Sequence, residues 1–357
     1  MVQPKSLGGS LESRAVEFVS IVVSPMPNPR YRHRYRQLTF QMGGMALRVI
    51  GVLLMLSALA IPMSRAPDRG VETLVARWAP PPSDFLEVKG QLVHYRDEGP
   101  RDDATPLVLL HGTAASLHTW EGWVKALKGK KRVITFDMPG FGLTGPFAGS
   151  YAADDYRGDT LAKFVIDLLD TLGVQRVAIG GNSLGGEVAW RVAALAPARV
   201  ERLILVDASG TDFKSESVGL GFVLARIPGI NRVFEEVLPR ALVAQTVLSV
   251  YGDAGKVSPE LVDRYYELML RSGNRHALGL RLQQMEPGEH VNKIAQLKLP
   301  TLILWGGRDK LIPRKVAHEL QHLIARSELL VYEDLGHVPQ EEDPALTVVA
   351  VKGFLGL

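Results

Sequence analysis

The chain has 357 residues, of which 46% are hydrophobic and 22% charged, a composition typical of a globular protein rather than a disordered one. Seven Lys and Arg against two Glu give residues 1–48 a net charge of +5, which leaves residues 49–357 at −2 of the total +3. The body therefore has no basic field that would bind nucleic acid. The absence of cysteine excludes disulfides, thiolate metal sites and a cysteine nucleophile.

The N-terminal region predicts a targeting segment. Residues 1–44 form a basic extension without the pattern of a folded domain, and residues 45–63 form a signal or anchor segment. The uncharged run Val49–Met63 is shorter than the roughly 20 residues that span a bilayer, and Ala58-Leu59-Ala60 resembles a signal-peptidase site. An uncleaved anchor, a signal peptide cleaved near Ala60 and a buried helix remain open. Because the basic flank precedes the run, both export interpretations place the rest of the chain outside the cytoplasm, in the periplasm or extracellular space.

Beyond this segment, residues 64–84 predict a linker, stiffened by the prolines of "RWAPPPSD". A regular pattern begins at Phe85 with a hairpin around Lys89-Gly90. Helical segments, among them Asp159–Leu172 and Ser183–Leu195, separate continuous apolar runs of the kind found in parallel strands buried on both faces. These runs are "PLVLLHG", "RVITFDMPG", "RVAIGGNS", "RLILVDASG", "PTLILWGGRD" and "ELLVYEDLGH". The alternation predicts an α/β fold, a mostly parallel twisted sheet flanked by helices.

The strand pattern is interrupted once, between Gly210 and Lys298. This stretch is helix-like and is broken by Pro228 and Pro239. We expect a helical cap over residues 212–294, inserted between two parts of the core, residues 85–211 and 295–357. Extended connecting helices without a covering role are the alternative.

A glycine-rich turn, "VAIGGNSLGGEVAW" from Val177 to Trp190, joins a strand to the helix that follows. Its residues Gly181-Asn182-Ser183-Leu184-Gly185 fit G-x-S-x-G, in which a serine on a sharp strand-to-helix turn stands free above the sheet. The flanking glycines let strand and helix approach closely. The pattern predicts that Ser183 is a nucleophile. A turn with an idle serine is the alternative, and the spacing does not fit a G-x-G-x-x-G dinucleotide loop.

Two later strand ends supply the partners that a serine nucleophile needs. A hydroxyl requires a base, and the base an orienting carboxylate. Asp309 and His337 follow the last two predicted strands, and Ser…Asp…His is the order expected on this architecture. The amide of Leu184 and that of Thr113 or Ala114, in "HGTAAS", are the expected donors to a developing oxyanion.

Together these residues resemble the α/β-hydrolase superfamily over about Phe85–Leu357. The markers are "HGT" at His111, "FDMPGFGLT" from Phe136, "GNSLGG" around Ser183, "WGGRD" ending at Asp309 and "GHVPQEEDP" from Gly336. The resemblance implies acyl transfer to water, in which Ser183 attacks, His337 carries the proton and Asp309 holds the imidazole. A serine nucleophile argues against haloalkane dehalogenases and epoxide hydrolases, which attack with aspartate.

Other side chains could take some of these roles. Asp207, in "LVDASG", and Asp334 are alternatives to Asp309 as the orienting acid. His111 and His118 are expected to hold the oxyanion loop rather than to carry protons. Trp120 and Phe141 are candidates for the substrate pocket, with core packing as the alternative for both.

A different class of enzyme is suggested by "HELQH", His318 to His322, which fits the H-E-x-x-H motif of zinc peptidases. This helix joins the Asp309 strand to the His337 strand, so it should lie on the outer surface, and the next strand begins too soon for a third ligand. We therefore expect incidental surface histidines and no metal or cofactor.

Two further alternatives share the fold. An idle hydrolase that only binds a ligand usually lacks a triad member, and this chain has all three. The sequence "GNSLGG" also resembles the "GNSMGG" of hydrolases that cut carbon–carbon bonds, but those carry a G-P-G-like loop and a tryptophan after the histidine. Here Thr113-Ala114-Ala115 and Val338-Pro339 stand instead. The expected substrate is a small-molecule ester with a short or medium acyl group, long-chain lipids and the oligomeric state being left open.

Overall fold

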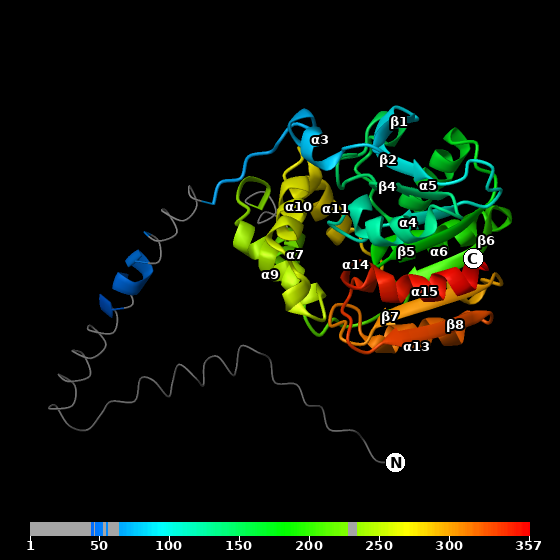
Figure 1. Ribbon diagram of the computed structural model, residues 1–357. Coiled ribbons are helices and arrows are strands. Elements are labelled where there is room, and N and C mark those ends of the chain that lie inside the picture. The colour runs from blue at the N-terminus through cyan, green and yellow to red at the C-terminus, as the bar shows by residue number, and fades with distance from the viewer. Residues whose placement is uncertain (1–43, 46, 53–54, 56–63, 228–233) are drawn as a thin grey trace, which may run out of the picture. The chain divides into compact units, whose positions relative to one another are not determined.

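The computed structural model describes residues 44–45, 47–52, 55, 64–227 and 234–357 (Figure 1). The chain divides into two compact units, Met1–Met63 and Ser64–Leu357. All of the predicted extension except Gly44, and most of the predicted signal or anchor segment, lie outside the described residues. Among the residues that are described, no helix is both long and apolar enough to cross a membrane.

The second unit contains one eight-stranded sheet with the order β1-β2-β4-β3-β5-β6-β7-β8. Strands β1 and β2 pair antiparallel, as do β2 and β4, and all the other neighbours are parallel. The predicted hairpin is present, and Lys89 and Gly90 at its turn both have positive φ. The strands are β1 Asp84–Val88, β2 Gln91–Glu98, β3 Leu107–Leu110, β4 Val133–Phe136, β5 Val177–Asn182, β6 Val200–Val206, β7 Thr301–Gly306 and β8 Ser327–Tyr332.

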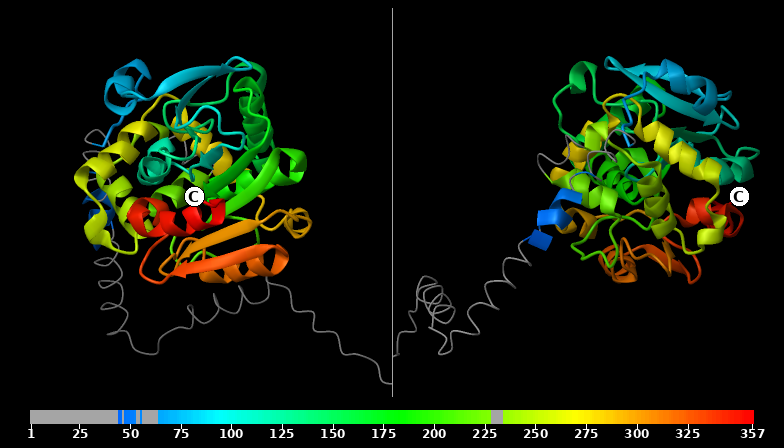
Figure 2. Two further views of the ribbon diagram at one scale, coloured as in Figure 1. Left: turned by 45° about the vertical axis from the view of Figure 1, so that its right-hand side comes forward. Right: turned by 90° about the vertical axis from the view of Figure 1, so that its left-hand side faces the viewer.

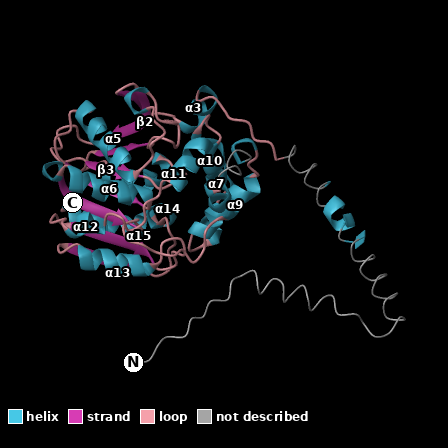
Figure 3. Ribbon diagram, turned by 180° about the vertical axis from the view of Figure 1, so that it is seen from behind, coloured by secondary structure: helices cyan, strands magenta, loops and turns pink. Residues whose placement is uncertain are grey.

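Helices cover both faces of the sheet because its central strands are apolar on both sides. In β3, Leu107 and Leu109 belong to the cluster with α4 and α15, whereas Val108 and Leu110 belong to the cluster with α5 and α6. Figure 3 shows the magenta strands lying among the cyan helices that flank them. The helices of the core are α4 Glu121–Leu127, α5 Gly158–Thr171, α6 Leu184–Leu195, α12 Val291–Ala295, α13 Arg314–Leu323, α14 Pro339–Glu342 and α15 Pro344–Leu355. Short 3₁₀ helices span Leu117–Trp120, Gly149–Tyr151, Pro197–Arg199 and Ala254–Lys256. The predicted α/β-hydrolase sheet is thus confirmed.

Further helices lie between β6 and β7, in the described residues of the stretch where we expected a cap. They are α7 Leu220–Arg226, α9 Arg240–Val250, α10 Pro259–Met269 and α11 Asn274–Gln283. Helix α7 packs against α9 and α11, and α9 packs against α10. The views in Figure 2 show these yellow and yellow-green helices together on one side of the unit.

The linker expected over residues 64–84 is instead part of the folded unit. It contains helix α3, Glu72–Trp78, whose Leu74 is buried. The carbonyl of Trp78 lies 2.9 Å from Nε2 of His118, and the Trp78 indole donates to Glu267 over 2.7 Å. The prediction was wrong because it relied on the prolines of Pro80–Pro82, whereas the apolar residues before them pack on the body.

Candidate active site

Ser183 occupies the turn between β5 and α6 in a strained conformation. Its φ of 56° and ψ of −116° lie in a region that non-glycine residues rarely adopt. Both neighbouring glycines are required by space. A Cβ at Gly181 would lie 2.2 Å from the carbonyl carbon of Gly185, and one at Gly185 would lie 2.1 Å from the carbonyl oxygen of Leu110. The close approach of strand and helix therefore fixes the Ser183 side chain at the end of the sheet.

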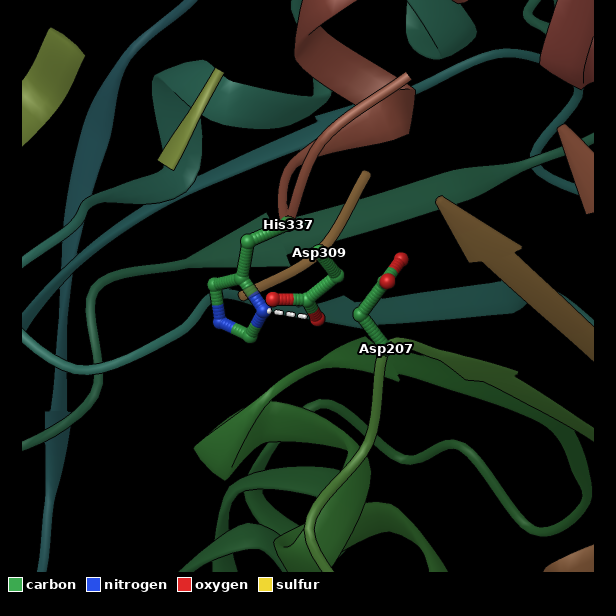
Figure 4. A group of neighbouring side chains, drawn as sticks. All are labelled: Asp207, Asp309 and His337. Atoms are coloured by element: carbon green, nitrogen blue, oxygen red, sulfur yellow. Dashed lines mark hydrogen bonds and ion pairs between the residues drawn. The ribbon is translucent and has the colours of Figure 1, made fainter. Parts of the chain in front are cut away.

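Asp309 and His337, which follow β7 and β8, form a buried pair at the same end of the sheet (Figure 4). The imidazole Nδ1 lies 2.7 Å from Oδ2 of Asp309. The other carboxylate oxygen accepts hydrogen bonds from the amides of Leu311, at 2.8 Å, and Ile312, at 3.0 Å. Both oxygens are thus engaged, and an Nδ1–H proton held by Asp309 leaves Nε2 of His337 able to accept one.

Asp207 lies beside this pair, at the end of β6. One oxygen each of Asp207 and Asp309 and a ring nitrogen of His337 all lie within 4.8 Å of one another (Figure 4). Oδ1 of Asp207 accepts the amide hydrogen of Gly306 over 2.9 Å. Burial, and then the charge of Asp309, raise the pKa of Asp207 well above its usual value. Burial thus favours the protonated form of Asp207, and Asp309 is the carboxyl group that contacts the imidazole.

The three predicted oxyanion donors gather around the serine. Thr113, Ala114 and Leu184 all line the cavity that Ser183 and His337 also line. The next amide in the loop, that of Ala115, donates to the carbonyl of Gly112, whereas the amides of the three predicted donors donate to no described residue. Ala114 has a φ of 60°, so the loop is bent sharply at this point. The arrangement can offer backbone N–H groups to an oxyanion formed next to Ser183.

The cavity beside Ser183 has a volume of about 470 Å³ and extends beneath the cap helices. Its wall is largely apolar and is built from α7, α9, α11 and the segments that flank them. The cap contributes Phe213, Val218, Phe222, Val223, Ile227, Phe234, Leu238, Leu242, Val243, Val247, Met269, Leu278, Leu282 and Met285 to this wall.

The two aromatic residues predicted for this pocket do not line it. Trp120 is fully buried in the cluster with α4 and α15 and packs against Trp123 at a ring-centroid distance of 5.0 Å. Phe141 packs edge-on against the ring of His111 at 5.7 Å. Both side chains are packed in the core, and residues of the cap line the cavity instead.

Two residues that position the site were missed by the sequence analysis. The side-chain Nδ2 of Asn182 donates to the backbone carbonyl of His337 over 2.9 Å and so ties the histidine loop to the serine turn. The carboxylate of Glu342 accepts the amide hydrogens of Gly336, Gly252 and Asp253 at 2.8 to 2.9 Å. Asn182 stands inside the serine motif and Glu342 inside "GHVPQEEDP", so their positions, though not their partners, could have been singled out.

His111 and His118 contact the loop that carries the predicted oxyanion donors. Nε2 of His111 accepts the amide hydrogen of Met138 over 2.9 Å, and its Nδ1 lies 2.8 Å from the carbonyl of Gly112. Burial lowers the pKa of His111, and it lowers the pKa of His118 to about 4. Both rings are thus neutral and hydrogen-bonded to the chain, an arrangement suited to a structural role.

Asp137 also anchors the loop that carries the predicted oxyanion donors, a role that the sequence analysis did not predict. The amide of Leu117 donates to one carboxylate oxygen over 2.7 Å, and the other oxygen lies 2.7 Å from Nδ1 of His94. Burial alone would raise the pKa of Asp137, but the charge and hydrogen bond of His94 outweigh it and hold this pKa well below its usual value. A buried carboxylate with several donors is a structural anchor for the loop.

The H-E-x-x-H residues lie elsewhere. His318 and His322 are exposed on α13. Glu319 between them accepts the hydroxyl hydrogen of Thr211 and pairs with Lys315 at 3.1 Å. Within the described part of the chain, neither histidine belongs to a group of three or more His, Asp or Glu side chains close enough to share a metal ion.

The fold and this arrangement of side chains at the strand ends are those of a hydrolase of the α/β type. Residues 105–344 match the alpha/beta hydrolase fold family, and the chain belongs to that family.

The named relatives carry out several reactions. The chain is 29% identical over 260 residues to a 2-hydroxymuconate semialdehyde hydrolase of a Pseudomonas species, and the matched region covers 70% of this chain and 86% of that protein. It is 30% identical over 267 residues to the dihydrolipoyllysine-residue acetyltransferase component of the acetoin cleaving system of Pseudomonas putida, covering 73% of this chain and 66% of that longer protein. Among solved structures, a meta-cleavage product hydrolase of Pseudomonas fluorescens is similar, with a TM-score of 0.66, 26% identity and coverage of 76% of this chain and 97% of the other.

Proposed function

We propose that the protein is a serine hydrolase that cleaves carboxylic esters through an acyl-enzyme intermediate. The observation that carries the proposal is that Ser183 and His337 line one largely apolar cavity and that the imidazole of His337 is paired with the buried Asp309. Ser183 Oγ attacks the ester carbonyl while His337 Nε2 takes up its proton, and His337 then returns the proton to the departing alcohol. Water, deprotonated by the same imidazole, hydrolyses the acyl-enzyme.

Two charges develop during this reaction, an imidazolium and an oxyanion, and the chain can stabilise both. Asp309 faces Nδ1 of His337 and stabilises the imidazolium that forms during attack. The amides of Leu184 and of Thr113 or Ala114 would stabilise the oxyanion, because a positioned backbone donor acts strongly in a site that excludes water.

The cavity favours a neutral, apolar acyl group. Arg281 lies in its wall, but its guanidinium is already paired with Glu187 at 2.6 Å, and Arg226 is exposed. A carboxylate-bearing substrate would need a buried cation free to pair with it. Short and medium acyl chains need only the aliphatic wall, which is what the cap helices provide.

Carbon–carbon bond hydrolysis is the second candidate, favoured by the 29% identity with the semialdehyde hydrolase. The two activities separate in a direct assay with p-nitrophenyl esters of increasing acyl length and, in parallel, a 2-hydroxy-6-oxo-dienoate. We expect turnover of the esters with an optimum at medium chain length and no comparable turnover of the dienoate. The opposite preference would refute the ester proposal.

We also propose that residues 45–63 anchor the protein in a membrane, with the catalytic unit outside the cytoplasm. The support is the uncharged run Val49–Met63 behind a basic extension. Cell fractionation and N-terminal sequencing of the active species test this. Active soluble protein that begins at Ile61 would show cleavage near Ala60 instead, and a cytoplasmic catalytic unit would refute export altogether.

A further inference from the structure

Helix α7 turns an apolar side outward. Leu220, Val223 and Ile227 follow one another at intervals of three and four residues, so they share one face of the helix and of its C-terminal continuation. They are 58%, 43% and 39% exposed, whereas the small residues Gly221 and Ala225 are buried. Helices on the surface of a soluble domain normally bury such a stripe against the core.

This stripe is part of a larger exposed apolar surface that adjoins the wall of the cavity. Val218, which is 44% exposed, precedes α7, and Leu248, which is 40% exposed, lies on α9, against which α7 packs. We call Val218, Leu220, Val223, Ile227 and Leu248 the apolar rim. Three of them, Val218, Val223 and Ile227, are both exposed and part of the cavity wall. Apolar surface therefore continues from the inside of the cavity to the outside of the cap.

The folded unit begins at the same cap. The amide of Ala66 donates to the carbonyl of Glu236 over 3.0 Å, and the amide of Leu238 donates to the carbonyl of Ser64 over 3.2 Å. Residues 236–238 lead directly into α9. In the sequence, the apolar run Val49–Met63 directly precedes Ser64.

We propose that the apolar rim docks on the surface of a phospholipid bilayer, so that the cavity opens toward lipid. An exposed apolar stripe is what an interfacial helix buries at the surface of a bilayer, and the proposed membrane segment directly precedes the folded unit in the sequence. On the basis of the proposed function, the natural substrate is then an ester of an amphiphile that enters the cavity from the bilayer.

The charges near the rim indicate which force holds it. Arg65 and Arg226 are exposed, but so are Glu216 and Glu236, so the surface has no single sign. Docking therefore depends on buried apolar area, and we expect it on zwitterionic phosphatidylcholine with only weak dependence on salt.

Site-specific labelling of the full-length chain tests the docking. Because the chain has no cysteine, Leu220→Cys, Leu248→Cys and Val349→Cys each carry one fluorophore. Val349 is the matched control, since it is an apolar residue 65% exposed on α15. In phosphatidylcholine vesicles, spin-labelled phosphatidylcholine should quench the fluorophore at 220 and 248 at least about threefold more than at 349. Equal quenching at all three positions would overturn the proposal, as would self-quenching at 220 that is relieved by unlabelled protein, because the rim would then bind a second copy.

A second experiment separates docking from catalysis. The double variant Leu220→Ser/Leu248→Ser changes no residue of the cavity wall. It should hydrolyse soluble p-nitrophenyl butyrate as the wild type does and a vesicle-embedded ester about tenfold more slowly, since two apolar side chains no longer enter the lipid. Val349→Ser should change neither rate. Equal rates of the double variant and wild type on the vesicle substrate would contradict the docking role, whereas absence of soluble ester turnover in the wild type would contradict only the proposed function.

Discussion

The polar side chains of the proposed site, at the strand ends, are held by hydrogen bonds. By contrast, α7, α9 and α11 line the cavity mainly with aliphatic and aromatic side chains. Asp309 has hydrogen-bond partners at both oxygens, and Asn182 ties the serine turn to the histidine loop. In the described part of the cap, the polar contacts at the cavity wall are fewer: Arg281 pairs with Glu187, and the hydroxyl of Tyr265 donates to Glu341. For the proposed hydrolase, we therefore expect the reaction chemistry to depend on the core and the substrate preference on the cap, so that substitutions in the two regions change different kinetic quantities.

The largest expected effect comes from removing the base in the core. His337→Ala should lower kcat on p-nitrophenyl butyrate on the order of 10⁴-fold or more, since neither serine deprotonation nor alcohol protonation is then assisted. His318→Ala and His322→Ala on the exposed side of α13 are matched controls and should retain most activity, also in the presence of a chelator. Inhibition by the chelator that is reversed by zinc would contradict the serine mechanism.

Substitutions of the two carboxyl groups in the core should differ sharply in their effect on kcat. Asp309→Asn should lower kcat on the order of 10³-fold, because the amide no longer stabilises the imidazolium and favours the wrong tautomer. Asp207→Asn should cost only a few-fold, since a neutral amide replaces a carboxyl whose pKa is raised by burial and by the charge of Asp309. The pair is compared by steady-state kinetics with circular dichroism as a folding control. A greater loss in Asp207→Asn would show that the orienting acid is misassigned.

A cap substitution should change selectivity rather than chemistry. Val247 is buried in the cavity wall on α9, and Val247→Phe would fill part of the 470 Å³ space. We expect the ratio of kcat/KM for octanoyl to acetyl p-nitrophenyl esters to fall about tenfold, with the acetyl value unchanged. A parallel fall for both esters, at unchanged thermal unfolding, would mean that the cap contributes to the chemistry itself.

The smallest effect on activity, but a measurable one on stability, is expected at His118, which joins α3 to the core. Burial lowers its pKa to about 4, below its ordinary value of 6.5. Between these pH values the unfolded chain binds a proton that the folded chain does not, so stability is retained above pH 6.5 and falls as the pH approaches 4. The free energy of unfolding should fall by about 2–3 kcal/mol between pH 6.5 and pH 4. Urea unfolding at pH 7, 5.5 and 4.5 measures it, and His118→Gln should show a flatter pH profile than the wild type. An equally steep profile would assign the loss to other groups.

The sequence predicted the core better than the cap for a physical reason. Parallel strands buried on both faces leave continuous apolar runs, and the serine turn requires glycines at fixed positions, so strands such as Val177–Asn182 and the place of Ser183 follow from local pattern. The partners of His337 lie on separate strands, and only the known order of the family suggested which acid would face it.

The wrong predictions concern contacts between distant segments. The prolines before Phe85 indicated a linker, yet Leu74 and Trp78 pack on the body through residues nearly 200 positions away. Trp120 and Phe141 stand next to motif residues in the sequence, but their rings turn into the core. The spacing of residues along the chain does not predict either kind of packing, because both depend on which apolar surface the folded cap leaves uncovered.

The central claim, that Ser183 is the nucleophile, is tested most directly by labelling with a fluorophosphonate. Intact-mass analysis should show one phosphonyl group per chain, peptide mapping should place it on Ser183, and ester turnover should fall in proportion to labelling. Ser183→Ala, which keeps the turn backbone, should neither be labelled nor turn over ester above about one thousandth of the wild-type rate. Labelling at another residue, or near wild-type turnover by folded Ser183→Ala, would contradict the account.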